Sequence, residues 1–261
     1  MKKRVMRFFF CLCIISLCTF SISAQAQSYN WYCIRNKEHK QPVLDANMSF
    51  IENHNGYFVD KNYSEFGKDN VIYLTFDAGY ENGNIERILD VLKEENVPAA
   101  FFILENLISK NPELVLRMDN ERHTVCNHTS KHKDITKYSD VNELKNELEN
   151  LENQYKNLTG KEMKKYFRPP EGKFDEKSIA MISNLGYKTI FWSFAYADWD
   201  NSKQPSREAA KEKIFTNLHN GEIMLLHPTS KTNADIMSEV IKELKAMGYR
   251  FGTLDELTQN A

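Results

Sequence analysis

The sequence predicts a single α/β domain built from parallel strands and crossover helices, and three observations support this prediction. The chain has 261 residues, 41% hydrophobic and 27% charged, which is enough for one sizeable core. From residue 71 onward, short β-rich runs alternate with helix-length amphipathic segments. Seven such units fit a closed or nearly closed barrel, with a doubly wound open sheet as the alternative.

The chain begins with a pattern typical of a secretory signal peptide. MKKRVMR carries four basic and no acidic residues, the apolar run FFFCLCIISLCTF follows, and Ala24-Gln25-Ala26 provides small residues for cleavage. We expect residues 1–26 to be removed and the mature protein to be secreted without a membrane span. An uncleaved membrane anchor is the alternative.

Removal of this segment changes the charge and the cysteine content. It takes away four of the 34 basic residues and none of the 36 acidic residues, so the formal charge falls from −2 to −6. An acidic chain does not favour nucleic-acid binding. Three of the five cysteines also leave, and the remaining Cys33 and Cys126 either pair or stay free.

The remaining chain divides into an extension and a main domain. Residues 27–65 are polar and aromatic without a long period, and we interpret them as an N-terminal extension that packs on a domain at 66–261. The strands predicted in that domain are 71–76, 99–104, 123–127, 166–168, 188–193, 222–227 and 249–252. Two helical stripes between them are interpreted as core faces: Ile85, Ile88, Leu89 and Leu92, and Val141, Leu144, Leu148, Leu151 and Tyr155.

Ionisable residues follow several of the predicted strands. In a barrel of parallel strands, the chemistry lies on the loops at the C-terminal ends of the strands. The residues found there are Asp77, His128, Arg168, Asp198 and His227. We therefore expect these five side chains to converge on one rim.

Two segments present polar groups in short loops. NHTSKH places His128 and His132 four residues apart, a spacing that suits a divalent transition metal such as zinc, although a solvated polar loop explains it equally well. In YFRPPEG, two prolines and Gly172 predict a rigid loop that presents the guanidinium of Arg168 and a backbone N–H. A plain Pro-Gly turn is the alternative for this segment.

Two further segments suggest proton transfer and sugar binding. IMLLHPTS exposes His227 at a strand end, where a histidine can exchange protons near neutral pH; a structural histidine is the alternative. SFAYADWD sets Trp199 beside Asp198, which suits sugar rings or ordinary core packing. The chain has no G-x-S-x-G elbow, P-loop or dinucleotide glycine fingerprint, so serine-hydrolase, kinase and dehydrogenase functions lack their characteristic parts.

The segments TFDAGY, HTSKH, RPPEG, ADW and LLHPTS resemble, in order and spacing, the five motifs of the polysaccharide deacetylases, the NodB-homology group or carbohydrate esterase family four. The resemblance covers roughly residues 70–258. TFDAGYENGN, FFI, RPPEGKF, FWSFAYADWD and the Trp-containing extension most resemble the sporulation deacetylases that make muramic δ-lactam in cortex peptidoglycan. The resemblance implies a distorted (β/α)7 barrel and a hydrolase that removes N-acetyl groups from amino sugars.

The resemblance also implies roles for the rim residues. Asp77 matches the base that takes a proton from the attacking water, and Arg168 matches the arginine that orients it. His227 matches the acid that protonates the leaving amine, and Asp198 the carboxylate that tunes this histidine. His128 and His132 match the metal-binding histidines.

Four more positions are implied to contact the substrate. The backbone N–H of Glu171 matches an oxyanion donor. Leu225 matches the apolar residue that lines the pocket for the acetyl methyl group. Tyr80 and Trp199 are the aromatic residues that we expect to contact the glycan.

The chain departs from the family pattern at two positions. Ala78 stands where most members have a second aspartate that completes an Asp-His-His metal site, and Ala195 replaces the first acid of the fourth motif. We therefore expect a divalent ion, zinc by preference, to be weakly held. The δ-lactam-forming relatives also lack the second aspartate and are active. Ala78 therefore weakens the prediction that a metal ion is bound more than the prediction that the protein is an enzyme.

The expected substrate is N-acetylmuramic acid in a peptidoglycan glycan strand from which peptide has been removed. Alternatives are N-acetylglucosamine, chitin or xylan glycans with the same chemistry, or a non-catalytic carbohydrate-binding protein on the same fold. We expect a monomer that acts in the cell wall or the spore cortex.

Overall fold

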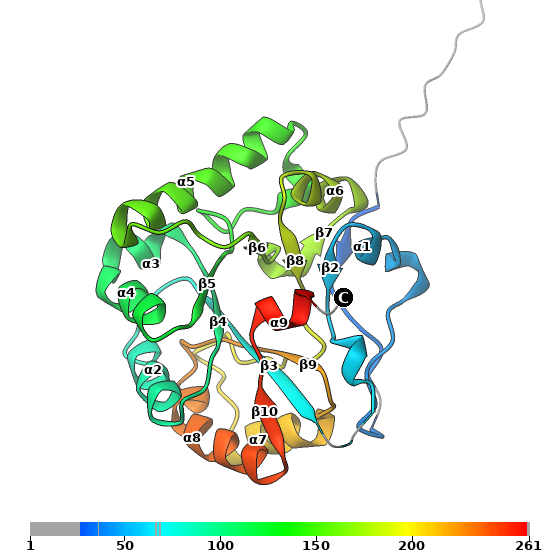
Figure 1. The fold of residues 1–261 in the computed structure, drawn as a ribbon, viewed down its shortest axis with the longest axis vertical. Helices are drawn as coiled ribbons and strands as arrows, with labels where there is room; N and C mark the ends of the chain where they lie inside the picture. Colours follow the sequence, from blue (N-terminus) through cyan, green and yellow to red (C-terminus); the bar gives the residue numbers. More distant parts are fainter. Residues whose placement is uncertain (1–26, 36, 66, 68, 260–261) are drawn as a thin grey trace, which may run out of the picture.

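The computed structural model describes residues 27–259 except 36, 66 and 68, so the predicted signal peptide lies outside the described residues (Figure 1). The strands are β1 (Tyr29–Asn30), β2 (Gly56–Tyr57), β3 (Asn70–Ala78), β4 (Ala100–Ile103), β5 (Thr124–Asn127), β6 (Tyr166–Phe167), β7 (Lys173–Phe174), β8 (Lys188–Ile190), β9 (Glu222–Leu226) and β10 (Tyr249–Phe251). The α-helices are α1 (Phe50–Asn53), α2 (Ile85–Glu94), α3 (Glu105–Lys110), α4 (Pro112–Asn120), α5 (Val141–Thr159), α6 (Glu176–Asn184), α7 (Arg207–Asn217), α8 (Lys231–Ala246) and α9 (Leu254–Gln259).

The core of the molecule is a curled parallel sheet with helices around it (Figure 1). Its strands run in the order β10-β3-β4-β5-β6-β8-β2, and β9 pairs with β3. Beyond β8, the backbone N–H of Leu225 donates to the Phe194 carbonyl at 2.9 Å, which ties the segment after β8 to β9 and nearly closes the ring. This arrangement confirms the predicted distorted α/β barrel.

The long central strand β3 explains why the sheet is parallel and covered on both faces. All its residues except Asp77 are buried. A strand that is buried on both faces reads as a nearly continuous apolar run instead of an alternation. Because parallel strands end at the same edge, the loops after β3, β5, β6 and β9 meet on one side of the barrel.

The helices follow the predicted stripes. On α5 the buried residues are Leu144, Leu148, Leu151 and Tyr155, whereas Val141 is 38% exposed. Val141 was predicted on this stripe, but it is the first residue of the helix, where the apolar face is not yet covered. The Asp140 side chain accepts a hydrogen bond from the Asn142 N–H and caps the helix start.

The seven predicted strands are all present, and the structure adds three two-residue strands, β1, β2 and β7. Strand β2 lies within residues 27–65 and pairs in parallel with β8 through Gly56–Thr189 and Tyr57–Ile190. Two residues are too few to produce a periodic signal in the sequence. The segment before residue 65 therefore contributes an edge strand to the sheet.

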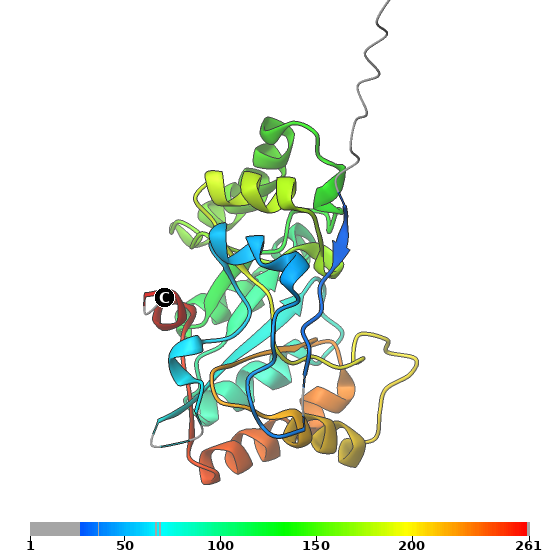
Figure 2. The same cartoon turned by 90° about the vertical axis from the view of Figure 1, so that its right-hand side faces the viewer.

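The N-terminal segment runs along one side of the barrel (Figure 2), and Trp31 attaches it there. Its ring stacks on Phe191 with centroids 4.2 Å apart, and its Nε1 donates to the Trp192 carbonyl at 2.8 Å. Its backbone N–H donates to the Gly172 carbonyl at 2.7 Å. Gly172 has φ +65°, and a Cβ there would lie 2.9 Å from both Trp31 and Trp192, so only glycine fits.

The two cysteines of the described chain are free thiols. The Cys33 thiol donates to the Ser193 carbonyl, and the Cys126 thiol is buried and donates to the Thr124 carbonyl. Of the two possibilities left open by the sequence, the structure has the unpaired one. No helix in the described part of the chain is long and apolar enough to cross a membrane.

We predict that Trp31→Ala lowers the free energy of unfolding by about 3–5 kcal/mol, because it removes a buried aromatic side chain and its hydrogen bond. Ile34→Ala is the matched control: its side chain is 54% exposed, and we expect a change of less than about 0.5 kcal/mol. Urea unfolding followed by circular dichroism measures both. Equal unfolding midpoints for the two variants would contradict this role of Trp31.

Candidate active site

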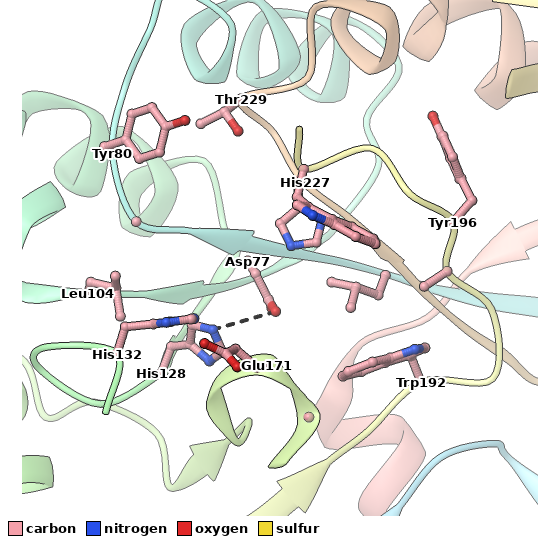
Figure 3. A pocket seen from close by; sticks show the side chains of 15 residues that line it. Asp77, Tyr80, Leu104, His128, His132, Glu171, Trp192, Tyr196, His227 and Thr229 are labelled. Atoms are coloured by element: carbon pink, nitrogen blue, oxygen red, sulfur yellow. Dashed lines mark ion pairs between the residues drawn. The ribbon is translucent and has the colours of Figure 1, made fainter. Parts of the chain in front are cut away.

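A pocket of about 780 Å³ opens at the C-terminal ends of the strands (Figure 3). Eight of the ten predicted site residues line it: Asp77, Tyr80, His128, His132, Glu171, Trp199, Leu225 and His227. Arg168 and Asp198 lie behind this lining, and both side chains are fully buried. The structure therefore brings the five rim residues expected from the strand ends into one place.

Asp77 and Arg168 form an ion pair at the base of the pocket. The Arg168 Nη1 donates to the Asp77 Oδ1 at 2.8 Å, its Nη2 donates to the Thr75 Oγ1 at 2.9 Å, and its Nε donates to the Ile190 carbonyl at 2.9 Å. The guanidinium also lies 4.1 Å from the centre of the Phe102 ring. A buried charge is tolerated only when it is paired and hydrogen-bonded, and Arg168 meets both conditions.

The charge state of Asp77 follows from these neighbours. Burial on its own would raise the pKa of Asp77, but the charges of His128, Arg168 and His227 outweigh it and hold the pKa below its usual value. Burial lowers the pKa of His128 to about 4, so this imidazole is neutral near pH 7. Near pH 7, the positively charged group that is hydrogen-bonded to Asp77 is therefore the guanidinium of Arg168.

His128 presents a free nitrogen to the pocket. Its Nδ1 lies 2.9 Å from the Arg168 carbonyl, and because a carbonyl only accepts, the proton of the neutral ring is on Nδ1. Its Nε2 then carries the lone pair and lies 3.6 Å from the Asp77 Oδ2. Figure 3 shows Asp77 between His128 and His227.

His132 lies on a loop and not on a helix. Thr129 and His132 both have left-handed backbones, with φ of +67° and +56°, and the Asn127 Oδ1 accepts the Thr129 N–H at 2.9 Å. These turns bring the His132 ring to 4.9 Å from the His128 ring, centroid to centroid. Burial lowers the pKa of His132 as well, so both rings are neutral.

These two histidines are the groups that fit a divalent metal ion. Neutral imidazole is a good ligand for such ions, and the Nδ1 hydrogen bond of His128 fixes its ring as second contacts of metal sites do. Ala78 is buried and has no donor atom. Among the described residues, no group of three His, Cys, Asp or Glu side chains is arranged to hold a metal ion. The residues present therefore fit a two-histidine site that needs other ligands to complete it.

His227 and Asp198 form the second pair of the site. The His227 Nδ1 lies 2.7 Å from the Asp198 Oδ1, and the His227 backbone N–H donates to the Asp198 Oδ2 at 2.8 Å. Burial on its own would lower the pKa of His227, but the hydrogen bond and the charge of Asp198 outweigh it and raise the pKa. This histidine therefore keeps its proton above the pH at which an ordinary histidine loses it.

Glu171 lies in the short turn η4 (Pro170–Gly172) at the pocket wall. Its backbone is left-handed, with φ +55°, which is costly for a residue with a side chain. The prolines before it and Gly172 after it hold this conformation. Its carboxylate pairs with Lys173 at 2.5 Å.

Aromatic side chains form part of the pocket wall. Trp199 is 60% exposed with its ring 6.1 Å from the His227 ring, and Tyr80 is 46% exposed with its hydroxyl bound to Asn201. Trp192 and Tyr196 also line the pocket and were missed from the sequence. Both belong to the aromatic segment FWSFAYADWD, whose density of rings was the available signal.

Comparisons with known proteins agree with this geometry. A family model described as polysaccharide deacetylase matches residues 65–190, a range that ends before Asp198 and His227. The chain is similar to the peptidoglycan-N-acetylmuramic acid deacetylase PdaA of Bacillus subtilis, with 33% identity covering 94% of each chain. It is also similar to a peptidoglycan-N-acetylglucosamine deacetylase of Bacillus cereus, with 31% identity covering 73% of this chain and 69% of that protein.

The same similarity holds for solved structures. The structure of Bacillus subtilis PdaA, a family 4 carbohydrate esterase, matches with a TM-score of 0.82 at 34% identity, covering 88% of this chain and 97% of that chain.

We predict that Ala78→Asp tightens zinc binding by at least about tenfold, because it supplies a charged oxygen ligand beside the two histidines. Ala78→Asn is the matched control, since it has a similar shape without the charge, and we expect a smaller gain. Isothermal titration calorimetry measures the affinity, and circular dichroism checks that the buried position tolerates the change. An unchanged affinity in a folded Ala78→Asp protein would show that position 78 does not face the histidines.

Proposed function

Because the chain belongs to the polysaccharide deacetylase family, whose members hydrolyse amide bonds, we propose that it removes the N-acetyl group from N-acetylmuramic acid in peptidoglycan. The observation that carries this proposal is the placement of two opposed pairs in one pocket. Asp77 is held by Arg168, and His227 is held by Asp198. An ionised carboxylate and a protonated imidazole in the same pocket are the base and the acid that amide hydrolysis requires.

In the first step, Asp77 takes a proton from a water molecule while the water oxygen forms a bond with the acetyl carbon. Arg168 keeps the Asp77 carboxylate ionised and oriented. The developing oxyanion is stabilised by the backbone N–H of Glu171, whose left-handed conformation is supported by its rigid turn. A divalent ion bound by His128 and His132 would supply polarisation of the acetyl carbonyl.

In the second step, the bond between the acetyl carbon and the sugar nitrogen breaks. His227 donates its proton to the nitrogen, so that a neutral amine leaves and acetic acid remains, which then releases its proton to solvent as acetate. Leu225 lines the pocket beside His227 and provides an apolar surface for the acetyl methyl group. Trp199 and Tyr80, both partly exposed at the rim, offer ring faces to the sugar.

The proposed substrate, N-acetylmuramic acid, is taken from the name of one of the relatives reported above. PdaA is named for N-acetylmuramic acid, and its similarity extends over 94% of this chain. When peptide has been removed from muramic acid, the freed amine can close on the lactyl carboxylate with loss of water, which forms a δ-lactam. We propose that this reaction takes place outside the cytoplasmic membrane, in the cell wall or in the spore cortex.

A second candidate substrate is N-acetylglucosamine, because the Bacillus cereus relative is named for it. The chemistry and the roles of the pocket residues are the same for both sugars. A non-catalytic, glycan-binding role fits less well, since a retired site has no need for Asp77, Arg168 and His227 in these positions.

Mass spectrometry of muramidase-digested glycan tests the proposal. The purified mature protein is incubated with peptide-stripped peptidoglycan and, separately, with N-acetylglucosamine oligomers, each with and without a chelator. Loss of acetate followed by loss of water on muramic acid supports the proposal. Acetate loss only from N-acetylglucosamine supports the second candidate, and no acetate loss from either substrate contradicts both.

We predict that Asp77→Asn lowers kcat by at least about a hundredfold, because an amide cannot take the proton of the attacking water. Asp60→Asn is the matched control: Asp60 is also buried, but it accepts the Tyr73 hydroxyl and lies outside the pocket. Acetate release measures activity, and thermal unfolding gives the folded fraction of each variant. Near-normal activity in folded Asp77→Asn would contradict the base assignment.

The pH profile of kcat/KM gives a further prediction. The protonated form of His227 is the active one, and its pKa is raised, so activity should persist above the ordinary histidine pKa of about 6.5 and fall at higher pH. In Asp198→Asn the alkaline limb should move to lower pH, because the charge that raises the pKa is gone. An alkaline limb that does not move in this variant would remove His227 as the acid.

A further inference from the structure

We propose that Asn233 is a positioning residue for the general acid, because it holds Asp198 in place behind His227. This inference rests on the proposed deacetylase function, but it concerns a residue outside the pocket lining and outside the motifs recognised in the sequence. Asn233 lies in the first turn of α8 and is fully buried. Polar side chains are rarely buried to this degree without a specific set of partners.

The Asn233 amide contacts both members of the acid pair. Its Nδ2 donates to the Asp198 Oδ2 at 2.6 Å and lies 3.1 Å from the His227 carbonyl. Asp198 therefore receives hydrogen bonds from the backbone N–H of His227, from its Nδ1 and from Asn233. Among the described residues, removal of Asn233 would leave His227 as the remaining hydrogen-bond donor to this carboxylate.

Tyr196 determines which way the Asn233 amide points. The Tyr196 hydroxyl contacts the Asn233 Oδ1, and burial together with the charge of Asp198 raises the pKa of Tyr196, so the hydroxyl stays protonated and donates. Because Oδ1 accepts this bond, Nδ2 must face Asp198. The Tyr196 ring lines the pocket, so the chain Tyr196–Asn233–Asp198–His227 runs from the pocket wall to the acid.

The helix itself fixes the position of Asn233. The Ser230 Oγ accepts the Asn233 backbone N–H at 3.1 Å and so caps the start of α8, three residues after His227. His227 and Asn233 are therefore joined by a short, capped turn. This turn leaves the Asn233 side chain little freedom to move away from Asp198.

The consequence for His227 is electrostatic. When His227 loses its proton, the negative charge of Asp198 is no longer balanced within the pair, and the Asn233 N–H group stabilises that charge. Without this donor, His227 should keep its proton to higher pH and be a weaker acid. The other charged or titratable groups that act on His227 are Asp77, Arg168 and His132, and none of them contacts Asn233 among the described residues.

The test compares Asn233→Leu, which has a similar volume but no donor, with the milder Asn233→Ala and with Thr232→Val. Thr232 is the matched control, because it precedes Asn233 on α8 and its hydroxyl donates to the Pro205 carbonyl, not to the acid pair. Two properties are measured: kcat and KM for acetate release, and the titration of the His227 ring by ¹⁵N NMR. The second readout needs no substrate, so it stands even if the proposed substrate is wrong.

We expect Asn233→Leu to lower kcat about tenfold with KM unchanged, as for the loss of one hydrogen bond to a charged group. The His227 titration should move up by about one pH unit, and Asn233→Ala should shift it in the same direction. Thr232→Val should change neither property. The proposal is overturned if the His227 titration and kcat match the wild type in a folded Asn233 variant, or if Thr232→Val produces the same changes.

Discussion

The ion pair between Arg168 and Asp77 is the interaction on which the rest of the site depends. Arg168 is fully buried. Its backbone N–H donates a hydrogen bond to the Asn127 carbonyl, and its own carbonyl accepts one from the His128 Nδ1. One residue therefore connects β3, β5 and the loop after β6, and it sets the charge of Asp77 and the tautomer of His128 together. A charge buried this deeply is tolerated only while its partners stay in place. A movement of the pocket floor that separated Arg168 from Asp77 would therefore carry a large free-energy penalty.

The two ion pairs of the site shift the pKa values of Asp77 and His227 in opposite directions. On the strand side, the charges of His128, Arg168 and His227 together hold the pKa of Asp77 below its usual value, and on the loop side, Asp198 raises the pKa of His227. An ionised base and a protonated acid can then exist together near neutral pH, which two groups with ordinary pKa values achieve only over a narrow range. Asp77 and Arg168 lie at the ends of strands, whereas Asp198 and His227 lie on loops next to α8. The acid pair therefore relies more on side-chain contacts such as those of Asn233.

Much of this arrangement could be predicted from the sequence, and the limits have physical reasons. The continuous apolar run of β3 and the stripe of α5 carry their own signals, and parallel strands necessarily bring Asp77, His128 and His227 to one edge. Strand β2 has two residues and carries no periodic signal. Trp192 and Asn233 owe their positions to tertiary contacts, because nothing in an isolated aromatic or amide indicates whether it faces a pocket or a buried carboxylate.

The ionisation of Asp77 is the most direct test of the account. The measurement is a pH titration of the Asp77 side-chain carbon by ¹³C NMR in the wild-type protein, with the signal assigned by its absence from a protein in which Asp77 is replaced. The account predicts a carboxylate that stays ionised below the ordinary aspartate pKa of about 3.9. A titration at or above that value would mean that burial outweighs the neighbouring positive charges, Arg168 among them, and it would contradict the assignment of Asp77 as a base kept ionised by its neighbours.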